Sequence, residues 1–560
     1  MASIVGKRIK GQIYYYLREV ARVGGRPKIV SQRYLGKAAD ITAALDGAAT
    51  LPERTRHLGF GALAAAWQVL EQLGVVGIID QIVGARRADA ACTVGTYIAL
   101  AAVNRVVAPC SKLAFADWWQ TTAADRFIKV PAAALDHRRF WDAMDQITPA
   151  QTARIERAVV ARMVERFGLD LAGLVVDMTN FATFIDTGNQ RAPIAQRGKA
   201  KQKRVDLRLV GLGLVVTRDG GVPICSRPYP GDRPDVTQFT ALVDELAARF
   251  AGLGMALDAL TVVYDAGCDS ADNQAHLEAS GLHYVGSLRP SDHPDLLAVP
   301  ARRFQVVDVT RFGGLSAFET RAVALGADRR VIVTHSPTFH QRQAQGFEQT
   351  LAKARRQLAE LQARLARGKT RRPRQAVQAH IATILKPRWL DRVIAWELEG
   401  DRPASLRLHW RTDPTARRRL EAEVFGKRIL FTDHDWPVAE VVAAYRAQAD
   451  VEAGFRQLKD PRVVSFSPMF HWTEQKIRVH ALYCVLALGV AHLLRRQAAR
   501  AGIAMSVREL LATLDSIQET VLVYPSTGGR PRARRMLTEQ DPTAAQLYDL
   551  FGLAAYAPPG

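Results

Sequence analysis

The alternation of apolar and polar positions changes several times along the chain and divides it into regions. Residues 12–36 contain two β-prone runs separated by VGGRP, which predicts a hairpin with a glycine turn. From about 59 to 166 the apolar residues recur at helical spacing, which predicts an all-helical domain. After residue 170 the period becomes that of strands alternating with helices, so a third kind of structure begins there.

This third region predicts seven elements in the order β-β-β-α-β-α-β. They lie at 171–181, 206–217, 222–230, 237–250, 257–267, 270–280 and 282–288. The order is that of a ribonuclease-H-like core, although a generic α/β domain has the same pattern. The predicted fold class is therefore α/β, with a ribonuclease-H-like core as the specific hypothesis.

The pattern breaks again between about 290 and 425, where short strands precede a long helix. Apolar residues in this helix alternate spacings of four and three, which is a heptad seam. The seam consists of Phe347, Leu351, Ala354, Leu358, Leu361 and Leu365. We expect it to close an intramolecular helix pair, and dimerisation is the alternative. A second helix and two more strands follow, so the region predicts a mixed α+β insertion in the core.

These patterns together predict six segments, and a small β module and an all-helical domain precede the interrupted core. The segments are a basic β-hairpin module at 1–50, a helical DNA-binding or dimerisation domain at 55–166, the first part of the core at 167–289, the insertion at 290–425, the second part of the core at 426–500, and a C-terminal region at 501–560 that includes a basic tail at 525–536.

Composition narrows the possible partners. The 560 residues include 76 Lys and Arg against 55 Asp and Glu, a net charge of +21, which points to a polyanion such as nucleic acid. No run of 18 uncharged apolar residues is present and the N-terminus lacks the apolar stretch of a signal peptide, so we expect a cytoplasmic, nucleoid-associated protein. The five cysteines show no metal-binding or disulfide spacing.

Two acids stand out because each ends an apolar run. Asp177 closes LAGLVVD and Asp265 closes LTVVYD, and acids at neighbouring strand ends can converge on one point. Carboxylate oxygens are the ligands that Mg²⁺ prefers, and two such ions can assist phosphodiester cleavage. Asp is also common in ordinary turns. Asp186, Asp269 and Asp272 are nearby competitors for the same role.

A third acid lies in VVAAYRAQADVEAGFRQLK (441–459), which predicts one amphipathic helix. At about 100° per residue, five polar side chains fall within roughly 80° of arc beside an apolar stripe. They are Tyr445, Gln448, Glu452, Arg456 and Lys459. An ordinary surface helix with i,i+4 charge pairs would show the same pattern. In combination with the two strand acids, however, the position of Glu452 predicts that it is the third ligand of a metal site.

Here the chain resembles a known family. The segments LVVDMTNF, the basic stretch through RPYPGDRPD, VVYDAG and YRAQADVEAGFRQLK resemble the DDE transposases of bacterial insertion sequences. The resemblance is closer to the IS-four-like branch, whose last acid lies in Y-(2)-R-(3)-E-(6)-K. Tyr445, Glu452 and Lys459 match that pattern at the right spacing, whereas Gln448 replaces the expected arginine. The long insertion also lies where this branch carries one.

The resemblance implies a DNA transposase that cleaves transposon ends and joins the 3′-hydroxyl to target DNA. Asp177, Asp265 and Glu452 would be the catalytic, metal-binding triad, with Mg²⁺ as cofactor and Mn²⁺ as a substitute. The partner would be double-stranded DNA, both terminal inverted repeats and target, bound by a homodimer. Lys459 and Tyr445 would hold the backbone of the transposon end, as we also expect of Gln448 or the neighbouring Arg446 and Arg456.

Two further features bear on DNA binding and activity. The loop GKAKQKR predicts phosphate contacts through Lys199, Lys201, Lys203 and Arg204, although a solvated loop is the alternative. Gln448 removes a cation from the motif, so an impaired, transposase-derived DNA-binding protein remains an alternative function. A nuclease of the same fold without strand transfer is the other alternative.

Overall fold

The computed structural model describes residues 2–23, 26–49, 51–84, 90–199, 206–369, 371–525 and 532–559. The chain divides into two compact units. The first contains residues 1–65, 117–129 and 509–560, and the second contains residues 66–116 and 130–508. All the predicted catalytic residues belong to the second unit.

The first unit holds two small antiparallel sheets. Strands β1 (Ala2–Ile9), β2 (Gln12–Val23) and β3 (Arg26–Gly36) form one, and α1 (Ala38–Ala49) follows it. The expected hairpin is β2–β3, and the sequence pattern missed β1. Lys10 and Gly11 both have positive φ, which is the backbone of a tight hairpin turn, so β1 pairs with β2.

The second sheet of this unit joins sequence-distant strands in the order β17-β16-β4. It consists of β4 (Arg54–Gly59), β16 (Gln518–Val523) and β17 (Ala533–Leu537), accompanied by α21 (Pro542–Leu550). The predicted basic tail at 525–536 therefore contributes a strand where it is described. Short helices α5 (Phe115–Gln120) and α6 (Ala124–Phe127) fall at the predicted helical region but belong largely to this unit.

The helical part of the second unit packs around one long buried helix, α19 (Glu474–Arg500). Its neighbours include α4 (Val94–Val107), α7 (His137–Asp145) and α8 (Pro149–Phe167), while α2 (Gly61–Gln72) and α3 (Val75–Val83) lead into the group. Among the described residues, α19 is long and apolar enough to cross a membrane, and the bent pair α2 and α3 passes the same test. Because 94% of the apolar window of α19 is buried inside the protein, it has the character of a core helix.

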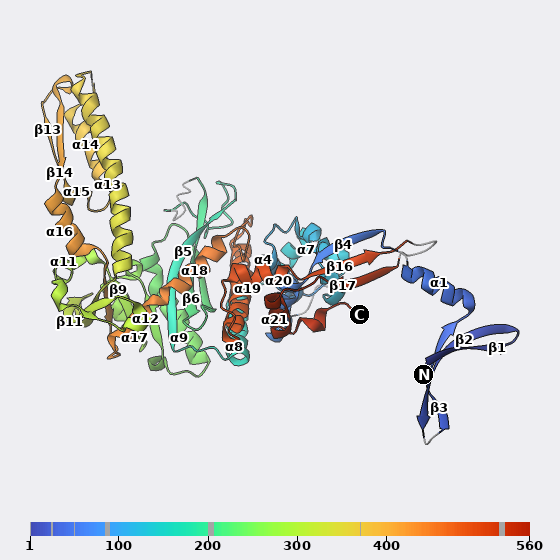
Figure 1. The fold of residues 1–560 in the computed structure, drawn as a ribbon. Helices are drawn as coiled ribbons and strands as arrows, with labels where there is room; N and C mark the ends of the chain where they lie inside the picture. The colour runs from blue at the N-terminus through green and yellow to red at the C-terminus, as the bar shows by residue number, and fades with distance from the viewer. Residues whose placement is uncertain are drawn as a thin grey trace. The chain divides into compact units, whose positions relative to one another are not determined.

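A nine-stranded mixed sheet organises the rest of the second unit, in the order β10-β11-β12-β15-β9-β8-β5-β6-β7 (Figure 1). Its first strands are β5 (Gly173–Thr183), β6 (Arg208–Thr217) and β7 (Pro223–Pro230). Helix α9 (Phe239–Gly252), β8 (Thr261–Tyr264), α10 (Ala271–Ala279) and β9 (His283–Leu288) follow. The predicted order β-β-β-α-β-α-β is confirmed. Strands β5, β8 and β9 run parallel, and β6 and β7 are antiparallel to their neighbours.

The predicted insertion begins with strands that extend this same sheet. After α11 (Pro294–Leu297) come β10 (Gln305–Val306), α12 (Val309–Phe312), β11 (Ser316–Ala324) and β12 (Ala327–His335), and β12 pairs with β15 (Lys427–Thr432). In turn β15 pairs with β9. The sequence pattern separates residues 290–335 from the core because their pairing partner comes about a hundred residues later.

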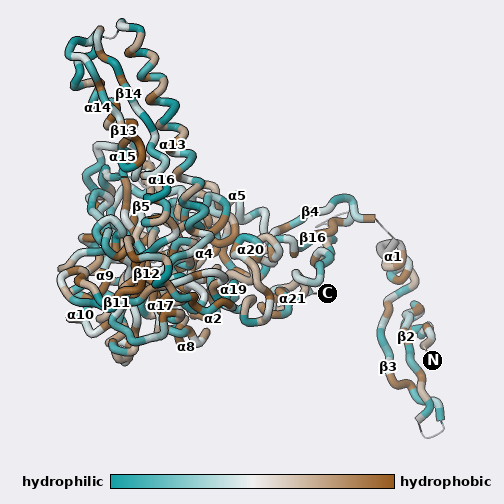
Figure 2. The backbone as a smooth tube through the Cα atoms, turned by 60° about the vertical axis from the view of Figure 1, so that its left-hand side comes forward, coloured by the Kyte–Doolittle hydropathy of each residue, from teal (hydrophilic) through white to brown (hydrophobic). Residues whose placement is uncertain are grey.

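The remainder of the insertion is an arm that leaves after β12 and returns at β15. It contains α13 (Pro337–Ala366), α14 (Arg374–Leu385), α15 (Leu390–Val393), β13 (Ile394–Glu399), β14 (Arg407–Thr412) and α16 (Pro414–Val424). The heptad seam is confirmed, since all six of its residues are buried and α13 packs on α14 and β14. The alternation of hydrophobic and hydrophilic positions along α13 and α14 can be followed in Figure 2. The seam therefore closes within the chain.

Candidate active site

Asp177 and Asp265 lie level with one another on neighbouring parallel strands. The β5–β8 ladder pairs Val175 with Val263, and both acids follow two residues later. Adjacent strands are about 4.8 Å apart, so their carboxylates share one edge of the sheet. Asp177 lies within β5 opposite Leu214, whereas Asp265 ends β8 and is exposed. The strand register thus sets the two acids at the same level of neighbouring strands, and the convergence of their carboxylates on one ion stays a prediction.

The surroundings of these two acids are electrostatically negative. Burial raises the pKa of the Cys268 thiol well above its ordinary value, and Asp265 and Asp177 raise it further. Burial also raises the pKa of Asp269 to about 7; the nearby Arg289 opposes this shift and Asp265 adds to it. A backbone N–H at Gly267 donates to Asp265 Oδ1 at 2.8 Å. The Cys268 thiol therefore lies close enough to both carboxylates for them to affect its pKa. A third acid, Asp269, lies beside them.

The helix that carries Glu452 differs from the sequence prediction. One continuous helix over 441–459 is wrong: α17 (Val438–Arg446) ends and α18 (Gln448–Lys459) begins on either side of Ala447. The Ala447 N–H turns back to the Ala444 and Tyr445 carbonyls, which closes α17. Tyr445 is 8% exposed whereas the Glu452 side chain is 62% exposed, so the two residues do not share one open face.

Helix α18 packs against β5, and Glu452 lies beside the residues of α18 that contact this strand. Gln448 Nε2 donates to the Val176 carbonyl at 3.4 Å, and Lys459 Nζ donates to Thr179 Oγ1 at 2.5 Å. Gln448, Glu452 and Lys459 fall within roughly 40° on this helix. Because the two contacts reach β5 on either side of Asp177, α18 lies along this strand, and Glu452 is at the exposed border of the contact. Its side chain is 62% exposed, with Arg456 Nη1 3.7 Å from its carboxylate.

Tyr445 is a buried support behind Asp265 and is not on the open face. Its hydroxyl donates to Ser287 Oγ at 3.0 Å and accepts from Arg428 Nη1 at 3.1 Å. Ser287 Oγ in turn accepts from the N–H of Ala266, the residue after Asp265. Burial raises the pKa of the Tyr445 hydroxyl. This chain of hydrogen bonds fixes the backbone at the end of β8.

The remaining motif residues are distributed between interior and surface. Gln448 is 8% exposed, and its Oε1 has no hydrogen-bond partner among the described residues. Arg446 is exposed, with its guanidinium 4.5 Å from the centre of the Phe312 ring. Contacts of these residues, and of Tyr445, Arg456 and Lys459, with DNA stay predictions.

The basic loop is only partly described. Lys199 is exposed, and its carbonyl accepts from Asn180 Nδ2 at 3.1 Å, which places this end of the loop beside β5. Lys201, Lys203 and Arg204 lie outside the described residues. The competing acids take other positions: Asp186 Oδ1 accepts from the Gly188 N–H at 2.6 Å, and Asp272 is exposed in the first turn of α10.

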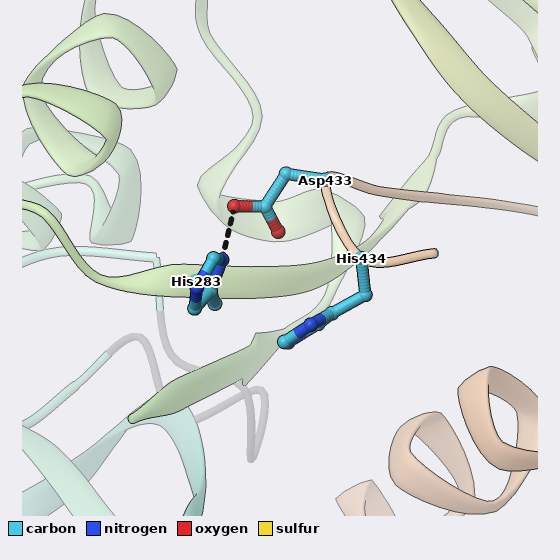
Figure 3. A group of neighbouring side chains, drawn as sticks. All are labelled: His283, Asp433 and His434. Carbon is cyan, nitrogen blue, oxygen red and sulfur yellow. Dashed lines mark hydrogen bonds and ion pairs between the residues drawn. The ribbon is translucent and has the colours of Figure 1, made fainter. Parts of the chain in front are cut away.

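A separate cluster of possible ligands lies at the opposite ends of the same strands. Ligand atoms of His283, Asp433 and His434 are within 4.8 Å of one another (Figure 3). Asp433 accepts from His283 Nδ1 at 2.8 Å and from the Tyr284 N–H at 3.0 Å, and His434 Nε2 is 2.8 Å from Thr261 Oγ1. Each member already has a hydrogen-bond partner, and these bonds connect the end of β15 to β9 or β8. We therefore interpret the cluster as structural.

Sequence reasoning missed two residues that shape the site. Thr179 receives Lys459, and Ser287 links Tyr445 to the end of β8. Asp269, which the sequence offered only as a competitor for the metal-binding role, lies beside Asp265. Thr179 could have been found, because it follows Asp177 by two residues and so shares its face of the strand. Ser287 carries no such signal, since its partner lies 158 residues away.

Comparison with known proteins identifies the family of the chain. A solved structure titled as the cryo-EM structure of the piggyBac transposase synaptic complex with hairpin DNA is similar at 9% identity and a TM-score of 0.36, covering 83% of this chain and 82% of that chain. No curated protein matches the chain. The family model described as the transposase DDE domain matches residues 170–467, which begins before Asp177 and extends beyond Glu452. The chain therefore belongs to the transposase DDE-domain family.

Proposed function

We propose that this chain is an insertion-sequence transposase that cleaves transposon ends and joins the 3′-hydroxyl to target DNA by two-metal phosphoryl transfer. The observation that carries the proposal is the register of β5 and β8, which sets Asp177 and Asp265 at the same level, together with the packing of α18 on β5. The strand order β7-β6-β5-β8-β9, with β5 in the middle, is the one expected of a ribonuclease-H-like core and supports it.

The donor set fits a hard divalent cation. Asp177, Asp265 and Glu452 offer only carboxylate oxygens, which are ligands that Mg²⁺ and Mn²⁺ favour. Asp265 and Glu452 are exposed to solvent. Bound ions would activate the attacking oxygen and stabilise the leaving oxygen. The three carboxylates would orient the scissile phosphate by holding these ions, and mutual repulsion between Asp177 and Asp265 would be relieved on binding.

Other residues would position DNA without taking part in the reaction. Lys459 lies within reach of β5, and the loop that begins at Lys199 runs beside the same strand. Their cations would neutralise phosphates of a double-stranded terminal repeat or target. Tyr445 would act indirectly, because its hydrogen bond to Ser287 fixes the backbone at the end of β8. A homodimer on DNA would bring two transposon ends together for concerted joining.

The test is a strand-transfer assay with a marked transposon end, a supercoiled target and Mg²⁺. We expect Asp177→Ala and Glu452→Ala to abolish end cleavage and joining while sparing end binding. The matched control is Asp272→Ala, an exposed acid in the first turn of α10 that the proposal leaves out of the metal site, and it should retain both activities.

Each outcome selects one function. Cleavage retained in Asp177→Ala or Glu452→Ala would overturn the triad. Cleavage by the native chain without any joined product would favour a nuclease of the same fold. End-specific binding without a metal-dependent product would favour a transposase-derived DNA-binding protein, and Gln448→Arg then becomes the variant that tests whether the missing cation is the cause.

A further inference from the structure

A second polar site lies in the helical part of the same unit. A cleft of about 620 Å³ is bounded by the segment from Arg105 to Leu113, by α7, and by the segment 468–476 that leads into α19. This volume is in the range of clefts that bind small ligands. Neither the family motif nor the proposed metal site includes any of its residues.

The floor of the cleft carries buried cations without matching anions. Lys112 is 7% exposed, and its Nζ has no hydrogen-bond partner among the described residues, although it lies 4.5 Å from the Tyr483 ring centre. Arg105 is 1% exposed; its Nη1 donates to the Ser467 carbonyl at 2.7 Å, but its Nε has no partner among those residues. Burying an unpaired charge is costly, so this arrangement is suited to receive an anion.

The neighbouring groups confirm that positive charge accumulates here. Burial lowers the pKa of His471 to about 3, and Lys112, Arg105 and Lys476 lower it further. Two acids, Asp142 and Asp145, also line the cleft, and Asp145 Oδ1 lies 2.5 Å from Lys476 Nζ. Burial and the nearby Arg105 also lower the pKa of Lys112 to about 7, so a bound anion would restore its full charge.

The rim of the cleft is aromatic and open. Trp141 is 39% exposed, Phe470 is 56% exposed and Trp472 is 48% exposed. The Arg191 guanidinium lies 4.4 Å from the centre of the Trp472 ring, which supports that ring on one side. Large aromatic faces exposed beside buried cations are the combination that binds single-stranded nucleic acid, because bases stack and phosphates pair.

We infer that this cleft binds one nucleotide of a single DNA strand, with its phosphate near Lys112 and Arg105 and its base on the aromatic rim. The inference deepens the proposed function and rests on it for the source of the strand. The Phe184 N–H donates to the Met469 carbonyl at 3.1 Å, which joins the cleft wall to the end of β5. A strand freed near Asp177 would have about 23 Å of β5 to follow to this cleft.

Fluorescence anisotropy of the full-length protein with a labelled short single-stranded oligonucleotide tests the inference. We expect Lys112→Met and Trp472→Leu each to weaken single-strand binding about tenfold or more, and to leave affinity for a duplex of equal length unchanged. The matched control is Trp396→Leu, a tryptophan of the arm that is 37% exposed and should have no effect.

Stability measurements separate loss of binding from loss of folding. Lys112→Met removes an unpaired buried charge, so its unfolding temperature should equal or exceed that of the native chain. Unchanged single-strand affinity in both variants, or an equal loss for strand and duplex, would overturn the inference. If dAMP competes with the labelled single strand much more strongly than inorganic phosphate does, the cleft is a nucleotide site. If the two compete equally, the cleft binds only an anion and the inference of a nucleotide site is wrong.

The proposed function can fail independently. Asp177→Ala should keep single-strand binding that depends on Lys112. If the native chain cleaves and joins DNA while the two cleft variants bind single strands normally, only the cleft assignment falls. If no cleavage occurs but binding still depends on Lys112, the cleft assignment stands without the transposase mechanism.

Discussion

The acidic edge of the sheet and the basic cleft both concentrate charge of one sign, but they hold it in opposite ways. Asp265 and Glu452 are exposed, and water screens their repulsion. Lys112 and Arg105 are more than nine-tenths buried, and both cations lie close to the Tyr483 ring. Exposed charge costs little stability while a ligand is absent, whereas buried unpaired charge lowers stability until the ligand arrives.

The comparison teaches that charge removal should have opposite effects at the two places. At the acidic edge it should abolish chemistry and leave the fold intact. At the basic cleft it should remove binding and make the fold more stable, as is common where function opposes stability.

The largest expected effect is on cleavage by Asp265→Asn. The asparagine retains an acceptor for the Gly267 N–H but loses the metal-binding charge, so end cleavage should fall by about 10³-fold or more, equivalent to about 4 kcal/mol of transition-state stabilisation. The unfolding temperature should stay within a few degrees of the native value. Cleavage rates and thermal melts measured on the same preparation check this, and a large drop in stability would mean that Asp265 is mainly structural.

The next effect is the pH dependence of stability caused by Lys112. Its folded pKa of about 7 lies below the ordinary lysine value of about 10.4, so between these limits the unfolded chain binds more protons. Stability should therefore rise with pH from about 7 to about 10, by a few kcal/mol at about 1.4 kcal/mol per pKa unit.

Denaturant unfolding of the native chain and of Lys112→Met across this range isolates the effect. The difference between the two proteins should shrink as pH rises, because deprotonation removes the cost that the variant lacks. Arg105, Cys110 and Cys484 surround the ammonium and are common to both proteins, so their own titrations largely cancel. A difference independent of pH would contradict a charged, buried Lys112.

A smaller effect sharpens the acidic side of the comparison. Tyr445→Phe removes the hydrogen bonds to Ser287 and Arg428 but keeps the ring, so cleavage should slow about tenfold, which corresponds to about 1.4 kcal/mol. Affinity for duplex ends should not change, because the hydroxyl is buried. A loss of affinity with an unchanged cleavage rate at saturating DNA would instead support the direct DNA contact that the family motif implies.

Much of the fold could be predicted because local patterns and pairings agree. The β5-to-β9 order follows from apolar strands alternating with helices, and the heptad seam of α13 identifies its buried face residue by residue. The assignment of β10–β12 could not be predicted, since β12 is joined to the core only through β15. The break at Ala447 also escaped notice, because alanine carries no helix-ending signal.

The acidic edge and the basic cleft also differ in how far each could be predicted from the sequence. Asp177, Asp265 and Glu452 each end or follow a clear apolar pattern, so sequence could place them together. The cleft brings Lys112 and Trp141 to Trp472, more than three hundred residues later, and a lone lysine after a helix has no distinguishing context. Only the packing of α4 and α7 against α19 brings these residues into one place.

The arm made by α13 to α16 has a consequence for how this protein can change. His335, where the arm leaves β12, is paired directly with Lys427, where the chain re-enters at β15. Excising everything between them would leave two strand ends already side by side, needing only a short turn to reconnect. Because loop-closure entropy grows slowly with length, an excursion from such a point can be gained, lost or exchanged at little cost to the sheet. The arm could thus be replaced without rebuilding the sheet from which it leaves.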